Sequence, residues 1–347
     1  EADSTKIEKV ILSNIGQKIL LKISPEIAHD LMIMGLKKTC NTPLASLYRQ
    51  DLSSKPVSVM GLEFPNRVGL AAGLDKNGEA IDAFYDMGFG HVEIGTVTPR
   101  EQSGNPKPRL FRIPEKKAII NRMGFNNQGI EQVLCNLSRR KTQGVVGINI
   151  GKNRDTPLEK SSEDYLVCLD QVYSFASYVT INISSPNTPE LRSLQFGSFL
   201  PELLSTLKER QDQLANHYDR YVPLAIKIAP DLNISEIKSI SEAILEIKLD
   251  GIIATNTTVD HSSVLGLRHS KEIGGLSGAP LFDRSIKVIS ALYELLGNKI
   301  PIIGVGGIMT AENAEKTFSS GARLIQIYSG FIYHGPTLIK RINSLHG

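Results

Sequence analysis

The sequence predicts an α/β barrel of eight parallel strands preceded by a module of two helices. Three observations predict it. From Arg67 onward, short apolar runs alternate with longer helical patterns, and there are eight such runs. Each run ends in glycine or polar residues, as strands do where a barrel carries its active site. The length of 347 residues is normal for a barrel that forms a single domain.

The composition fits a globular protein and excludes several classes. Hydrophobic residues make up 41% and charged residues 22%, and the net charge of +3 is too small and dispersed to predict nucleic-acid binding. Cys40, Cys135 and Cys168 are too far apart for a disulfide framework or a cysteine metal site, and no metal is expected. No stretch approaches the roughly 18 to 20 apolar residues of a membrane span, and no signal-peptide pattern opens the chain. We expect a protein that neither crosses a membrane nor is exported.

Residues 1–45 are expected to form a separate helical module before a barrel domain at 46–347. One helix is predicted over Ile7–Leu21, where apolar residues recur on one stripe. A second is expected to begin after Ser24 as N-cap, with Pro25 in its first turn and a broad apolar set behind it. Two interpretations stay open: the helices pack on the barrel, or they rest on an anionic lipid surface.

The eight runs are near-continuously apolar, which is typical of parallel strands covered by helices on both sides. An open dinucleotide-binding sheet would show G-x-G-x-x-G after its first strand, but "AAGLDKNG" stands there. The late partial match Gly304–Met309 has methionine at the third glycine position. The predicted strands are Arg67–Gly73, His91–Val97, Val145–Gly151, Tyr178–Ser184, Pro223–Ala229, Gly251–Thr257, Pro301–Gly307 and Leu324–Gly330.

The strand ends predict the site, and Lys227 is the sharpest single residue among them. It lies inside "LAIKIA", where a charge is not buried without a partner or ligand. Three interpretations stay open for it: a lysine that snorkels at a strand end, a Schiff-base nucleophile, or a fixed positive charge beside an electron-rich ring.

Asparagines and glycines at the strand ends indicate what the site would hold. Asparagines from different segments offer paired donors and acceptors, as a pyrimidine-like ring requires; they are Asn121, Asn149, Asn182, Asn187 and Asn256. The loops "GVGGIM" and "YSGF" follow the last two runs, where barrels bind phosphate, and a single terminal phosphate such as that of FMN is favoured. The cluster "GGLSG" at Gly274–Gly278 is expected to open the helix after the sixth strand and to line the same groove.

Taken together, the motifs closely resemble the class 2, quinone-dependent dihydroorotate dehydrogenases of bacterial type, from about Met60 to the C-terminus. They are "AAGLDKNG", "EIGTVTP", "NRMGFNN", "GINIGKN", "NISSPNTP", "KIAPDL", "ATNTT", "GGLSG", "IGVGGI" and "QIYSGF". The resemblance implies an FMN-containing barrel that oxidises dihydroorotate to orotate in pyrimidine synthesis and passes the electrons to a membrane quinone.

The resemblance also implies a role for each matching residue. Ser185 would be the base that removes the C5 proton while hydride leaves C6 for flavin N5, with Thr188 as relay and the segment after Pro189 as cover. Lys227 would be a fixed charge beside the flavin. The substrate would meet Lys76, Asn121, Arg122, Met123, Gly124, Phe125, Asn182, Asn187, Asn256 and Thr257. One FMN would contact Ala72, Gly73, Leu74, Asp75, Lys76, Thr96, Asn149, Asn182, Lys227, Thr255, Gly278, Gly307, Tyr328 and Ser329.

The resemblance gives the N-terminal helices a role as a slot through which quinone reaches the flavin, with His29, Arg112 and Tyr328 near its inner end. It implies a peripheral protein, expected to be a monomer, on the cytoplasmic face of the cell membrane. Two alternatives stay open: a class 1 enzyme that uses fumarate or NAD, and a non-catalytic flavin- or lipid-binding barrel. Class 1 relatives carry cysteine as the base, so Ser185 favours class 2.

Overall fold

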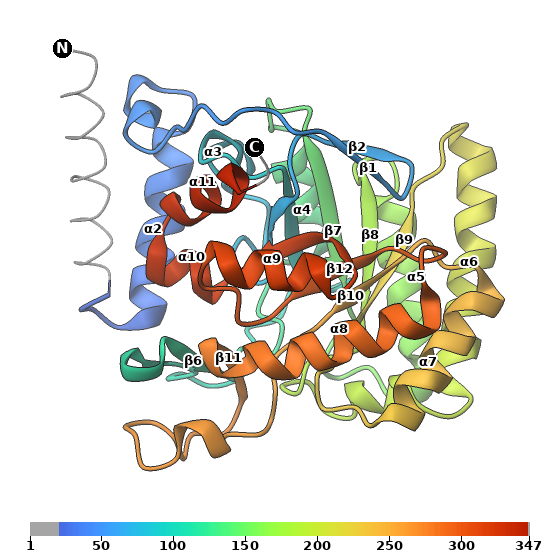
Figure 1. The fold of residues 1–347 in the computed structure, drawn as a ribbon. Coiled ribbons are helices and arrows are strands. Elements are labelled where there is room, and N and C mark those ends of the chain that lie inside the picture. The colour runs from blue at the N-terminus through green and yellow to red at the C-terminus, as the bar shows by residue number, and fades with distance from the viewer. Residues whose placement is uncertain (1–20, 346–347) are drawn as a thin grey trace.

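The computed structural model describes residues 21–345 and contains the expected closed barrel (Figure 1). The strands run parallel around it in the order β10-β12-β13-β3-β4-β7-β8-β9. Each of the eight predicted runs supplies one of them, so the predicted fold class is confirmed. Their bounds are β3 Val68–Leu70, β4 His91–Val97, β7 Val145–Ile150, β8 Tyr178–Asn182, β9 Leu224–Ile228, β10 Gly251–Ala254, β12 Ile302–Val305 and β13 Ala322–Ile327.

Helices surround the barrel, and the turns between them add short 3-10 segments (Figure 1). The helices are α3 Ile81–Asp86, α4 Gly129–Leu137, α5 Ser161–Val172, α6 Phe199–Tyr218, α7 Ile234–Ile247, α8 Phe282–Leu296, α9 Ala311–Ser319, α10 Ser329–His334 and α11 Thr337–Ser344. The 3-10 segments are η1 Pro43–Leu47, η2 Pro114–Lys116, η3 Leu158–Lys160, η4 Leu191–Gln195, η5 Ser262–Val264 and η6 Ala279–Leu281.

Alternate residues of the barrel strands face opposite sides of the barrel wall, as the period of two along a strand requires. On β4, Val92 and Ile94 belong to the large core shared with the surrounding helices. A smaller core inside the barrel includes Phe64 and Ile253. The intervening residue of β4, Glu93, is fully buried and joins the polar groups of the barrel interior.

A hairpin closes the barrel at the end where the strands begin. It consists of β1 Val57–Val59 and β2 Leu62–Phe64. Val59 and Phe64 enter the inner core, and Met60 lies so close to Gly251, at the start of β10, that a Cβ there would stand 2.7 Å from its sulfur. The opposite end, where the strands finish, is therefore the open one.

A three-stranded antiparallel sheet lies apart from the barrel strands, formed by β5 Leu110–Ile113, β6 Ala118–Asn121 and β11 Gly275–Gly278. The expectation that "GGLSG" opens a helix was wrong, because this segment is strand β11 and α8 begins only at Phe282. Glycine is required here by close pairing: a Cβ on Gly278 would stand 2.2 Å from the carbonyl oxygen of Lys117.

The second predicted helix is α2 Pro25–Thr39, which begins after Ser24 as expected. It buries Ala28, Ile33 and Leu36. The first predicted helix, Ile7–Leu21, lies almost wholly outside the described residues. Between residues 21 and 345, no helix is both long and apolar enough to span a bilayer. The division into 1–45 and 46–347 stays a prediction.

Candidate active site

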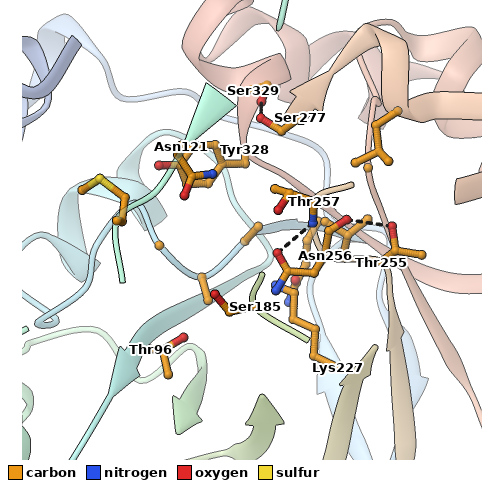
Figure 2. Close-up of a pocket in the computed structure, with 18 of the residues that line it drawn as sticks. Thr96, Asn121, Ser185, Lys227, Thr255, Asn256, Thr257, Ser277, Tyr328 and Ser329 are labelled. Atoms are coloured by element: carbon orange, nitrogen blue, oxygen red, sulfur yellow. Dashed lines mark hydrogen bonds between the residues drawn. The ribbon is translucent and has the colours of Figure 1, made fainter. Parts of the chain in front are cut away.

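A cavity opens where the barrel strands end, and it brings together most of the residues singled out from the sequence (Figure 2). Side chains from the strand ends and from the β5-β6-β11 sheet meet around it. The predicted residues that line it are Ala72, Gly73, Lys76, Thr96, Asn121, Met123, Gly124, Phe125, Asn182, Ser185, Asn187, Lys227, Thr255, Asn256, Thr257, Gly278, Gly307, Tyr328 and Ser329.

Four predicted residues do not line this cavity. Leu74 lines a second cavity, described below. Asp75 accepts hydrogen bonds from the backbone N–H groups of Glu79 and Ala80 just before α3. Arg122 pairs with Glu272 at 2.7 Å and lies over the ring of Phe111.

Asn149, the fourth, is fully buried under the cavity, where it supports residues that line it. Its Oδ1 accepts from the hydroxyl of Thr96 at 2.6 Å and from the amide of Asn182 at 3.0 Å. Asn182 in turn donates to Thr96 at 2.9 Å, which closes a triangle of polar side chains. This triangle fixes the amide orientation at the end of β8.

Ser185 projects from the loop that leaves β8, and its side chain is nearly buried. Its Oγ accepts a hydrogen bond from the backbone N–H of Asn187 at 3.2 Å. The amide of Asn187 donates to Oδ1 of Asn121 at 3.1 Å. Nearby, the hydroxyl of Thr188 is buried, and no group in the described part of the chain forms a hydrogen bond with it. The loop therefore presents a serine hydroxyl beside two amides in a site with little water access.

The loop after β10 is held against the Ser185 loop. The amide of Asn256 donates to Oγ of Ser184 at 2.9 Å, and Ser184 donates to Asn182 at 3.0 Å. Arg192 bridges the two loops from η4 by donating to the carbonyl oxygens of Ser184 and Thr257. Arg192 was not predicted from the sequence, because no pattern along the chain shows these contacts.

Lys227 lines the cavity (Figure 2). A buried carboxylate, that of Glu93, lies beside its ammonium group outside the cavity lining. Nζ of Lys227 is 4.0 Å from Oε1 of Glu93, and both side chains are buried. Burial lowers the pKa of Lys227, and the Glu93 carboxylate opposes that shift. Glu93 was missed in the sequence, although a charge inside the apolar run "HVEIGTV" is the same signal that drew attention to Lys227.

A second cation, Lys76, lies at another edge of the cavity. Burial lowers its pKa to about 8, and the nearby guanidinium of Arg109 adds to the shift. The carboxylates of Asp30, Glu26 and Asp75 oppose this shift only in part. A buried ammonium at the edge of a cavity is suited to an anionic ligand, because the ligand adds a countercharge.

The cavity has the features that FMN needs. Gly306 and Gly307 have positive φ, and a Cβ on Gly307 would stand 2.5 Å from the backbone of Phe282. Ser277 and Ser329 share a hydrogen bond at 2.9 Å and line the same cavity as these glycines, so hydroxyl groups and glycine backbone are both available to a phosphate there. Figure 2 shows the two serines side by side. Oε1 of Gln326 and Oγ1 of Thr257 are buried with no hydrogen-bond partner within residues 21–345. The residues present fit a flavin with a single phosphate, and no metal-binding cluster occurs within residues 21–345.

A second, apolar cavity of about 270 Å³ lies under α2. His29, Arg112 and Tyr328 are its polar residues near the barrel, and Tyr328 lines the central cavity as well. Nε2 of His29 donates to the carbonyl oxygen of Leu74 at 2.7 Å, and Arg112 donates to the carbonyl oxygen of Ile23 at 2.9 Å. Tyr328 thus separates a polar site from an apolar one.

Known proteins that are similar to this chain in sequence or in structure are dihydroorotate dehydrogenases. The family model "Dihydroorotate dehydrogenase" matches residues 55–345. "Dihydroorotate dehydrogenase (quinone)" of Shewanella denitrificans is 57% identical over 96% of this chain and 98% of its own length, and that of Aliivibrio fischeri is 57% identical over 96% and 99%. The crystal structure of DHODH from Eimeria tenella in complex with ferulenol superimposes with a TM-score of 0.86 at 38% identity, over 92% of this chain and 90% of that one. The chain belongs to the dihydroorotate dehydrogenase family.

Proposed function

We propose that this protein oxidises dihydroorotate to orotate in pyrimidine synthesis, with FMN as hydride acceptor and a membrane quinone as final electron acceptor. The observation that carries the proposal is the pair of cavities that share Tyr328, one ringed by Ser185 and amides and the other apolar. The names of the quinone-type relatives support the same reaction.

FMN, when bound, would supply a two-electron acceptor for hydride. The residues that would hold it are the predicted FMN contacts that line the central cavity, among them Lys227 and Gly307. Asn149 would support them from beneath the cavity through Thr96 and Asn182. Lys227 would offer a fixed positive charge toward the negative charge that reduction creates, which favours this role over a Schiff base or a snorkelling lysine because the ammonium is buried beside a carboxylate.

The asparagines would bind the pyrimidine ring. Asn121, Asn187 and Asn256 line the cavity and present amide donors and acceptors of the kind that alternating N–H and C=O groups require. Lys76 would face the substrate carboxylate, together with the backbone of the segment from Met123 to Phe125. Arg122, whose side chain pairs with Glu272, would act through its backbone or through the order of this segment.

Ser185 would remove the C5 proton of dihydroorotate. A serine alkoxide is too unstable to serve as a base in water, so the proton must pass on as the hydride departs, in a closed site. The burial of Ser185 and the unpartnered buried hydroxyl of Thr188 are consistent with such a relay. The segment after Pro189, which includes η4, would be the cover.

The apolar cavity under α2 would admit the quinone, with His29, Arg112 and Tyr328 at its inner end. The outer face of α2 exposes Ile27, Leu31 and Met34, and its last turn carries Lys37 and Lys38. This distribution suits a helix resting on an anionic lipid surface. We therefore propose a peripheral protein, monomeric, at the cytoplasmic face of the cell membrane.

The alternatives are a class 1 enzyme with a soluble acceptor and a barrel that binds flavin or lipid without catalysis. In the deciding experiment, purified protein is mixed with dihydroorotate while flavin absorbance is followed, and then quinone, fumarate or NAD is added separately. We expect bleaching, followed by recovery with quinone alone. Recovery with fumarate or NAD but not with quinone would sink the class 2 assignment, and a colourless protein would favour the non-catalytic alternative.

A further inference from the structure

Glu93 is a charged side chain at the centre of the barrel. It lies on β4 between Val92 and Ile94, which face the surrounding helices, so its carboxylate points inward and is fully buried. A carboxylate in this position is strongly unfavourable unless hydrogen bonds and an opposite charge compensate for lost water.

Neutral donors satisfy the carboxylate oxygens. Oε2 accepts from the hydroxyls of Tyr178 at 2.9 Å and Thr180 at 3.1 Å, and from the amide of Gln326 at 2.8 Å. Oε1 accepts from the amide of Asn149 at 2.9 Å. Gly147 makes room for this arrangement, because a Cβ there would stand 2.2 Å from the ring of Tyr178.

The opposite charge comes from Lys227, whose Nζ lies 4.0 Å from Oε1 of Glu93. Within residues 21–345, Glu93 is the one acidic residue that forms an ion pair with Lys227. The neighbours of Lys227 across the strand pairing are Asn182 on β8 and Ile253 on β10, which carry no charge. Two further titratable groups lie beside this cluster. Burial raises the pKa of the Tyr178 phenol well above its ordinary value, and burial lowers the pKa of His91, whose ring centroid is 6.4 Å from that of Tyr178, to about 3, so both stay neutral.

The charge of Lys227 therefore depends on one residue. Burial lowers the pKa of Lys227, and the Glu93 carboxylate is what opposes that shift. Glu93 also accepts a hydrogen bond from Nδ2 of Asn149. Oδ1 of Asn149 is thereby oriented to accept hydrogen bonds from Thr96 and Asn182 beneath the cavity.

We propose that Glu93 is a positioning residue that keeps Lys227 charged and aimed into the central cavity, so that the flavin meets a permanent cation. This inference rests on the proposed binding of FMN in that cavity. Glu93 itself does not line the cavity, so its influence would pass through Lys227 and Asn149.

The test is the midpoint potential of bound flavin between pH 6 and pH 9 in the wild type and in Glu93→Gln. At the acid end of this range Lys227 carries the most charge in both proteins, and the variant has lost a nearby negative charge, so its potential should equal or exceed the wild-type value. Because the Glu93 carboxylate opposes the lowering of the Lys227 pKa, the variant should lose more of this cation than the wild type as the pH rises to 9, and with it the charge that favours reduced flavin. We expect the potential there to fall at least about 30 mV below wild type, a tenfold change for a two-electron couple.

Two controls separate charge from packing. Tyr178→Phe removes a neutral donor to the same carboxylate, and Glu93→Asp keeps the negative charge. In both controls the midpoint potential should change with pH as it does in the wild type, so its difference from the wild-type potential should keep the same sign between pH 6 and pH 9. A Glu93→Gln profile parallel to wild type across this range would overturn the proposal.

If Glu93→Gln does not accumulate as folded protein, Lys227→Met is added to it. The double variant lacks the unpaired buried ammonium and should recover folding, measured by thermal unfolding. A double variant no more stable than Glu93→Gln would contradict the pairing. Failure of the proposed function is distinguishable, because wild-type protein would then lack FMN or would not bleach with dihydroorotate.

Discussion

The amide of Asn187 donates a hydrogen bond to Oδ1 of Asn121 across 3.1 Å, which joins the loop that carries Ser185 to the end of β6. Both side chains line the central cavity. Because the amide nitrogen of Asn187 is paired with the amide oxygen of Asn121, the orientation of both side chains is fixed before the substrate arrives.

Removing the donor of this hydrogen bond should weaken substrate binding. Asn187→Asp places a carboxylate oxygen opposite Oδ1 of Asn121, so two acceptors would face each other. We expect a loss of about 1–3 kcal/mol, which corresponds to a rise in the KM for dihydroorotate of roughly 5- to 150-fold. Steady-state kinetics measures the KM, and FMN content, expected to be unchanged, is the control. An unaltered KM would show that the pair does not shape the substrate site.

Removing the Ser185 hydroxyl should stop the reductive half-reaction. Ser185→Ala leaves the loop backbone and the cavity otherwise intact, so FMN and orotate should still bind. General base catalysis contributes about 10²- to 10⁴-fold, and the rate of flavin bleaching by dihydroorotate in stopped flow should fall by that amount. Wild-type bleaching rates in this variant would remove Ser185 from the mechanism.

Binding of the anionic product should depend on the protonation of Lys76, whose pKa is about 8 in the ligand-free protein. Below that pH the ammonium is charged and attracts the carboxylate of orotate, so the Kd should be lowest there and rise between pH 8 and pH 9. In the same protein, the lowered pKa means that the unfolded chain binds more protons above pH 8, so the contribution of Lys76 to stability increases from about pH 8 toward 10.5.

Titration of orotate into the oxidised protein, followed by the flavin spectrum, measures this Kd. Lys76→Arg is the matched variant, because a guanidinium stays charged throughout this range. Its Kd should be flat from pH 7 to pH 9. If the wild-type Kd is equally flat, Lys76 is not the group that meets the carboxylate.

Arg192 should matter for the reductive half-reaction although it lies outside the cavity lining. Its guanidinium donates to the carbonyl oxygens of Ser184 at 3.0 Å and Thr257 at 2.7 Å, and it pairs with Asp231 at 2.9 Å. A lysine cannot make these three contacts in one plane. Arg192→Lys should lower kcat/KM for dihydroorotate roughly 10- to 100-fold, the loss expected for hydrogen bonds made by a charged group.

Arg284→Lys is the matched control for Arg192, because Arg284 also pairs with Asp231, at 3.1 Å. Arg284 further pairs with Asp260 in the loop after β10, but it does not bridge that loop to the Ser185 loop. The kcat/KM of Arg284→Lys should change little. The rate of flavin reoxidation by quinone should be equal in both variants and the wild type. Equal loss in the two variants would mean that Asp231, and not the bridge between the loops, is what matters.

The barrel and the cavity were predictable from the sequence because both are encoded locally. A buried parallel strand is an apolar run, and its polar end marks the open side of the barrel, so residues such as Asn182, Lys227 and Thr255 could be placed at one site before the structure was known. The place of β11 in the β5-β6-β11 sheet was not predicted, because β11 pairs with β6 although the two lie far apart in the sequence, and "GGLSG" resembles a helix-preceding turn. The bridging role of Arg192 is not visible in the sequence for the same reason, since its partners Asp231 and Thr257 are distant along the chain.

The attachment of α2 to the barrel should depend on the ion pair between Glu26 and Arg109. Both side chains are largely buried, and Nη2 of Arg109 lies 2.8 Å from Oε1 of Glu26. Arg109 also donates to the carbonyl oxygen of Asn105, whose amide donates to the carbonyl oxygens of Arg122 and Asn187. Breaking a buried pair on one side costs about 3–5 kcal/mol, because the other charge stays buried. Glu26→Ala should therefore lower the melting temperature and displace α2 from the apolar cavity.

Lys37→Ala is the matched control, because Lys37 also ties α2 to the barrel, through Glu79 at 2.8 Å, but its side chain is half exposed. An exposed pair contributes at most about 1 kcal/mol, so this variant should melt near the wild-type temperature. In stopped flow, Glu26→Ala should slow flavin reoxidation by quinone more than flavin reduction by dihydroorotate, since the lining of the apolar cavity proposed to admit quinone is lost first. Equal slowing of the two half-reactions would indicate that the pair supports the loop that carries Ser185, through Asn105, as much as it supports α2.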